Sequence, residues 1–196
     1  MDFSIGSILA FAQFTVQNPR AAARGLMAMG LPDTARWLLF GVVATASAVL
    51  THVGLNLLPP DESQFMADAM ASPVRTAIFQ GGLLLIAGFA ITAIGRWQGG
   101  KGSFGDALLL ISWLQFVLLC LQVVQIVALL VLPPVAEIIG VLGLGLSFWL
   151  LTQFIVELHG FASSWRVLFG IVAAILAVAV AISVVLTVLV GVGVGG

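Results

Sequence analysis

Charged residues are scarce in this chain of 196 residues, which has seven basic and eight acidic side chains and a net charge of −1. A soluble globular domain has about 25% charged residues, whereas the share here is 8%. So little positive charge argues against a nucleic-acid binder, and a chain this apolar would aggregate in water. The sequence therefore predicts a protein whose solvent is lipid.

Cysteine is nearly absent, and tyrosine is absent altogether. The single cysteine, Cys120, cannot form an internal disulfide or a paired-cysteine metal site. The two histidines, His52 and His159, are expected near opposite faces of the membrane, where they cannot share a metal ion. The sequence also has no G-x-S-x-G and no H-E-x-x-H motif. We therefore expect no enzymatic activity, no metal and no cofactor.

Long apolar runs are what the chain does contain, and they take up more than half of it. A helix of about 20 apolar residues crosses a hydrocarbon core about 30 Å thick. Runs near or above this length predict an all-α integral membrane protein, with a bundle of five transmembrane helices in a domain over 37–196: 37–58, 76–95, 107–132, 138–156 and 167–190.

Residues 1–36 precede the first run and differ from it in composition. Isoleucine and phenylalanine recur there at steps of three, which predicts a helix with one apolar face: Ile5, Ile8, Phe11 and Phe14. Asn18-Pro19 ends this helix and starts a second one that contains Arg20 and Arg24. We predict two interfacial helices with the apolar side in lipid and the arginines at the headgroups. A disordered tail is the alternative.

The basic residues predict how the chain is oriented. All but one of the seven lie on one side of the predicted crossings, and the exception is Arg75. The positive-inside rule makes that side cytoplasmic, so we expect a bacterial inner-membrane protein with its N-terminus in the cytoplasm and its C-terminus in the periplasm. Trp37, Trp97 and Trp165 fall at the cytoplasmic ends of runs, as interfacial anchors do.

The connections between runs are short. Pro133-Pro134 predicts a tight turn between antiparallel neighbours. Ser103 and Asp106 have the spacing of a capping box that starts the third crossing. The glycine-rich segment 96–105 lacks the spacing of a Walker A motif, so we interpret it as a flexible turn.

Polar side chains within the apolar runs are the candidates for a functional site. The run 107–132 contains Gln115, Gln122 and Gln125, and the next contains Gln153 and is followed by Glu157. One interpretation is hydrogen bonding between helices, worth about 0.6–2 kcal/mol each. The other is a polar path for an ion or a small solute. A path of this kind usually needs ionisable groups near the midplane, and we place none there, which favours helix packing.

Two segments resemble bacterial members of the Yip1 family of five-helix membrane proteins. One is Gly99-Gly100-Lys101-Gly102-Ser103-Phe104-Gly105-Asp106, and the other runs from Gly143 through Trp149 to Glu157-Leu158-His159-Gly160-Phe161. The resemblance implies a five-crossing fold and a non-enzymatic role with membrane partners. The eukaryotic branch engages Rab-type GTPases and has an Asp-Leu-Tyr-Gly-Pro motif, which a chain without tyrosine lacks. GTPase binding is therefore not expected.

These observations together favour a non-catalytic scaffold or accessory protein of the inner membrane. Its expected partners are the lipid bilayer and either other integral membrane proteins or further copies of itself. The alternative is a small transporter or channel component that uses the polar faces of the third and fourth crossings.

Overall fold

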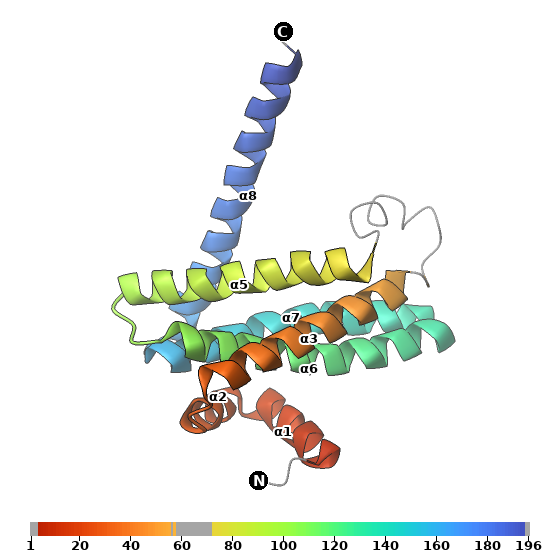
Figure 1. Ribbon diagram of the computed structural model, residues 1–196, viewed down its shortest axis with the longest axis vertical. Coiled ribbons are helices and arrows are strands. Elements are labelled where there is room, and N and C mark those ends of the chain that lie inside the picture. The colour runs from red at the N-terminus through yellow and green to blue at the C-terminus, as the bar shows by residue number, and fades with distance from the viewer. Residues whose placement is uncertain (1–3, 56, 58–71, 195–196) are drawn as a thin grey trace.

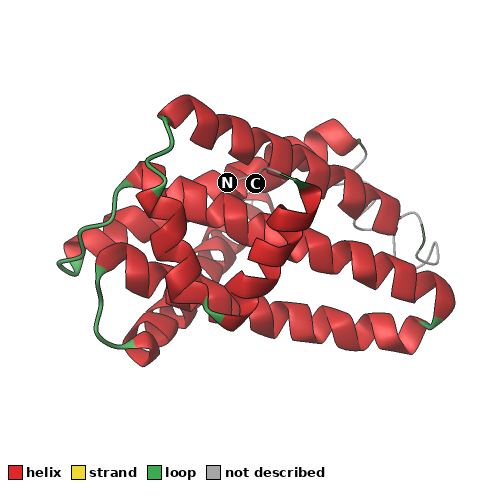
Figure 2. Ribbon diagram, turned by 90° about the horizontal axis from the view of Figure 1, so that it is seen from below, coloured by secondary structure: helices red, strands yellow, loops and turns green. Residues whose placement is uncertain are grey.

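The computed structural model describes residues 4–55, 57 and 72–194, and the regular structure in these ranges is α-helical throughout (Figures 1 and 2). The predicted all-α fold is thereby confirmed. The helices are α1 (Ile5–Gln17), α2 (Pro19–Ala28), α3 (Asp33–Leu55), α5 (Pro73–Trp97), α6 (Phe104–Val131), α7 (Pro133–His159) and α8 (Ser164–Val194).

Five helices are long and apolar enough to cross a membrane, which confirms the predicted multi-pass membrane protein. They are α3, α5, α6, α7 and the segment Ser164–Ala181 of α8, with mean hydropathies between 1.9 and 2.5. Each corresponds to one predicted run. The last part of the run 37–58 lies outside the described residues.

Helix ends extend beyond the apolar runs because caps, and not lipid, decide where a helix begins and ends. The Ser103 hydroxyl accepts a hydrogen bond from the Asp106 amide (3.1 Å) and donates one to its carboxylate (2.6 Å), which confirms the predicted cap of α6. Pro133 belongs to the first turn of α7, so the turn between α6 and α7 is the single residue Leu132. At its other end α7 stops at Gly160, which has a left-handed φ of 72°.

Helices α3, α5, α6 and α7 lie side by side as a bundle (Figures 1 and 2). Helix α6 is at its centre and packs against each of the other three. The most deeply buried large side chains belong to the first half of α6 and the second half of α7: Leu108, Leu109, Leu150 and Phe154. The core is therefore concentrated at one end of the bundle, where α3 and α6 begin and α5 and α7 end.

Helix α8 does not join this bundle, although five packed helices were expected. It leaves the end of α7 and runs steeply across the direction of the other four long helices (Figure 1). Its principal contacts are with α7, and none of its described side chains is buried. Hydropathy could not have revealed this arrangement, because an apolar side chain in lipid needs no protein neighbour.

The predicted N-terminal helices are present, but part of the apolar face of α1 lies on protein. The Phe11 ring is 5.1 Å from the Trp113 ring of α6, and the Trp113 indole N–H donates to the Thr15 hydroxyl at 2.9 Å. Thr15 is fully buried, whereas Ile5 is 79% exposed. The face that contacts the bundle is thus centred on Phe11 and Thr15, and the predicted apolar face is divided between protein and surface.

Candidate functional site

Three segments of the chain converge on the last two turns of α7. We call this region the α7 junction and define it by Gln153, Glu157 and His159. The N-terminal helix α2, the α5–α6 connection and the start of α8 all meet it. Because α3 and α6 start nearby, the junction lies at the most deeply packed end of the bundle.

Glu157 binds Arg24 of α2 through both of its carboxylate oxygens. The Arg24 Nε–Oε1 distance is 2.8 Å and the Nη2–Oε2 distance is 3.2 Å, which is the two-bond geometry of a strong arginine–carboxylate pair. The hydrogen bond and the negative charge of Glu157 raise the pKa of Arg24 above its usual value. The pair attaches α2 to α7 across 133 residues of sequence.

Gln153 binds the other N-terminal arginine, one turn before Glu157. The Arg20 Nε donates to the Gln153 amide oxygen at 2.7 Å, and its Nη2 donates to the Ser164 hydroxyl at 2.6 Å. Both partners are neutral. Among the residues that the structure describes, Arg20 has no acidic partner, in contrast to Arg24 and Arg36. The structure gives both N-terminal arginines protein partners, and their predicted role at the lipid headgroups stays a prediction.

His159 joins α7 to the α5–α6 connection. The Gly102 amide donates to His159 Nδ1 at 3.2 Å, so Nδ1 is an acceptor and the ring proton is on Nε2, which is 3.2 Å from the Ile91 carbonyl oxygen. The ring occupies the space that a Cβ atom would need at Gly95, Gly100 and Gly102. These glycines therefore permit close approach of the imidazole, and our interpretation of the segment as a flexible turn missed this role.

A second ion pair joins the starts of α3 and α6. Arg36, whose side chain is only 13% exposed, lies with Nη2 3.1 Å from Asp106 and with Nη1 4.0 Å from Asp33. From the sequence, Asp106 is predicted only as part of a helix cap, and Arg36 only as one of the basic residues that orient the chain. The spacing of Asp33 and Arg36 could have predicted an ion pair within α3. The contact of Arg36 with Asp106 on α6 could not be predicted, because the two residues are far apart in the sequence.

The glutamines of α6 bond to neighbouring helices, and their role in helix packing stays a prediction. The amide N–H groups of Gln115 and Gln122 donate to Ser47 and Thr51 of α3, at 2.7 Å and 3.4 Å. Gln125 donates to the Ala136 carbonyl of α7 at 3.2 Å. Gln153 and Glu157 instead bond to α2. Among the described residues, these polar side chains of α6 thus bond to α3 and α7, and those of α7 bond to α2.

The three tryptophans predicted as interfacial anchors lie at the same end of the molecule. Trp37 is near the start of α3, Trp97 is the last residue of α5, and Trp165 is near the start of α8. Their exposed fractions are 48%, 86% and 70%. Large exposed aromatic side chains at one level suit a membrane–water boundary, and the anchor role stays a prediction.

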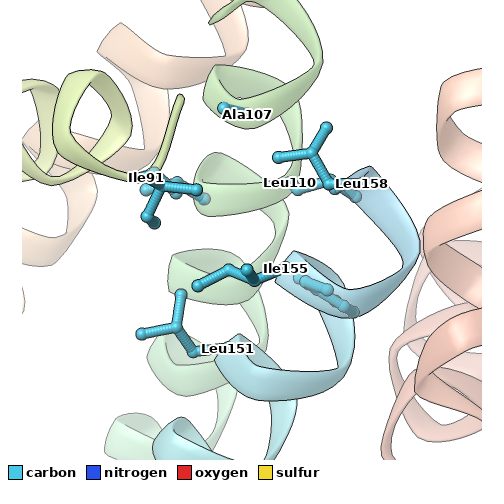
Figure 3. Close-up of a pocket in the computed structure, with 8 residues that line it drawn as sticks. Ile91, Ala107, Leu110, Leu151, Ile155 and Leu158 are labelled. Atoms are coloured by element: carbon cyan, nitrogen blue, oxygen red, sulfur yellow. The ribbon is translucent and has the colours of Figure 1, made fainter. Parts of the chain in front are cut away.

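One small cavity lies inside the best-packed end of the bundle. Figure 3 shows an apolar cavity between α5, α6 and α7, with Ile91, Leu110 and Ile155 among its lining residues. Its volume is about 10 Å³, which is at the lower limit for a single water molecule, and its lining supplies no polar partner. Within the described ranges, no three His, Cys, Asp or Glu residues are grouped to hold a metal ion.

A comparison with family models identifies one match. The model of the Yip1 domain matches residues 14–189, a segment that begins in α1 and includes all five long helices up to α8. No curated protein and no solved structure matches the chain. The matched segment also contains both partners of each α2–α7 contact, so these contacts lie within the family domain.

Proposed function

We propose, from the premise that this chain belongs to the Yip1 family, that it is a non-catalytic scaffold or accessory protein of the bacterial inner membrane. It binds other integral membrane proteins or further copies of itself through its transmembrane helices. Its N-terminus, with α1 and α2, is on the cytoplasmic side, and its C-terminus is in the periplasm. The six basic residues on one side of the crossings support this orientation.

The position of α8 is the observation that carries the proposal. Its apolar side chains are exposed along the helix, with Phe169 at 68%, Leu176 at 60% and Val180 at 62%. One side of α8 is made of small residues within about 100° of arc at 100° per residue: Gly170, Ala173, Ala174, Ala177 and Ala181. Small residues let two helices approach closely in lipid, where helix association depends on van der Waals packing. The occupant that suits this face is the transmembrane helix of a partner.

A pair of matched substitutions tests the proposal. Ala177→Leu places a bulky side chain on the small face of α8, whereas Ala179→Leu makes the same change on the opposite face. Both positions are exposed, so neither change disturbs packing within the chain. We expect Ala177→Leu to reduce self-association, or co-purification of membrane proteins, in mild detergent, and Ala179→Leu to leave both unchanged. Equal behaviour of the two variants and the original chain would overturn the role given to α8.

The alternative of a transporter or channel component has weaker support. Interhelical hydrogen bonds occupy the amide N–H groups of Gln115, Gln122 and Gln125. A solute path would have to break these bonds or go around them. Solute flux into proteoliposomes distinguishes the two functions.

A further inference from the structure

A groove lies between α2, α7 and the start of α8, next to the α7 junction. Its volume is about 580 Å³, which is within the size range of small-molecule sites. Its polar end is formed by Arg20, Gln153 and Ser163, and its other walls are mainly apolar, with Phe148 and Trp149 among them. One end of the groove is thus charged and the rest is mainly apolar, which matches the headgroup and the hydrocarbon chain of an amphiphilic molecule.

The charge at the polar end is positive and has no counter-ion among the described residues. Arg20 uses Nε and Nη2 for two neutral partners, and a guanidinium has five N–H donors in total. None of the residues that line the groove is acidic. An anion in the groove would therefore receive charge-assisted hydrogen bonds, and would not have to displace a carboxylate.

The start of α8 adds further donors at the same place. Ser163 and Ser164 line the groove with their hydroxyl-bearing side chains, and α8 begins at Ser164. The first amide groups of a helix lack partners within it, and the helix dipole favours negative charge there. The Arg166 amide donates to the Ser163 hydroxyl at 3.5 Å, which is long for a hydrogen bond and therefore weak.

The apolar part of the groove follows α7 from the polar end toward the middle of this helix. From Gln153 to Gly145 is eight residues, or about 12 Å at 1.5 Å per residue. A Cβ atom added at Gly145 would meet nothing within 4 Å, so the wall of the groove is open there. Trp149 and Trp165, which are 52% and 70% exposed, line the same groove. This depth and composition suit a hydrocarbon chain.

We infer that the groove binds one anionic phospholipid. Its phosphate lies against Arg20, Ser163 and Ser164, and an acyl chain lies along α7 past Trp149 to Gly145. The lipid fills the space between the bundle and the start of α8, and so joins two parts of the protein that otherwise have few contacts. This site is separate from the small face of α8 to which the scaffold proposal refers.

Native mass spectrometry of the full chain in mild detergent tests the site, with phosphatidylglycerol as the probe and phosphatidylcholine as the uncharged reference. We expect one phosphatidylglycerol to be retained in preference to phosphatidylcholine. Arg20→Gln should weaken retention about tenfold or more, because it removes the charge-assisted bonds. Lys101→Gln is the control of equal charge change, since Lys101 is exposed, lies in the α5–α6 connection at the same end of the bundle and does not line the groove. It should change retention less than about twofold.

A second variant tests the acyl-chain part without touching the phosphate end. Gly145→Leu places a side chain in open space within the groove, so the protein should keep its fold and its helix content while losing retained lipid. Glycerol 3-phosphate and inorganic phosphate form the soluble arm. Binding of these at comparable concentration, with lipid retention unaffected by Gly145→Leu, would identify a site for free phosphate and overturn the lipid assignment. Equal retention by the original chain and Arg20→Gln would overturn the site itself.

Discussion

The contact between His159 and the end of α5 makes a quantitative prediction about glycine. A Cβ atom at Gly95 would collide with three atoms of the imidazole ring, whereas a Cβ at Gly82, on the same helix, would meet nothing within 4 Å. Gly95→Ala and Gly82→Ala are therefore the same chemical change in two environments. Intrinsic helix propensity favours alanine over glycine by about 1 kcal/mol at both positions.

The collision should outweigh that propensity at Gly95 only. Forcing an extra carbon into a packed site typically costs about 1–3 kcal/mol. Once the propensity gain of about 1 kcal/mol is subtracted, Gly95→Ala should destabilise the protein by up to about 2 kcal/mol. Gly82→Ala should be neutral or stabilising by up to about 1 kcal/mol. Reversible unfolding in mixed detergent micelles, followed by tryptophan fluorescence, measures both changes.

Removal of the ring provides the refuting test. His159→Ala abolishes the bonds to Gly102 and Ile91, and should itself be destabilising because the amide and the carbonyl lose their partner. In that background Gly95→Ala should be stabilising by up to about 1 kcal/mol, as at Gly82, which corresponds to a coupling energy of about 1–3 kcal/mol in a double-mutant cycle. Additive costs for the two substitutions would show that the ring and Gly95 are not in contact, and the account of the glycines would fail.

Three further predictions concern the remaining contacts. Glu157→Gln removes the charge that holds Arg24, so amide hydrogen exchange in α2 should become faster while exchange in α6 stays unchanged; unchanged exchange in α2 would contradict the attachment. Gln122→Leu should alter helix association by about 1 kcal/mol or less and leave solute flux in proteoliposomes as it was, and a flux that this change abolishes would favour the transporter alternative. In a Cys120→Ala background, Lys101→Cys and Ser63→Cys should be labelled from opposite faces by an impermeant thiol reagent, and labelling from one face would refute the proposed orientation.

Local composition was sufficient to predict the membrane-spanning helices and their caps. Solvation by lipid depends on the side chains of one segment alone, so hydropathy identified all five long helices. The cap of α6 was equally predictable, because Ser103 and Asp106 are three residues apart and bond to each other.

Contacts between segments that are far apart in the sequence could not be predicted from the sequence alone. Arg20, Arg24, Gln153 and Glu157 were all candidates, but nothing local indicates that the arginines bond to residues 133 positions later. The sequence alone predicts a flexible α5–α6 connection, because His159, whose ring requires glycine there, is 57 residues from Gly102. Helix α8 is as apolar as the others, so its separation from the bundle has no counterpart in hydropathy.

The attachment of α2 to α7 has a consequence for biogenesis. Arg24 leaves the ribosome 133 residues before its partner Glu157, which at 5–20 residues per second is an interval of roughly 7–27 s. During this interval α3, α5 and α6 are synthesised while α2 has no partner on α7. Docking of α2 is therefore a late event that requires the chain to be translated through the end of α7. Nascent chains arrested before residue 153 should keep α2 accessible to protease, and those released beyond residue 164 should protect it.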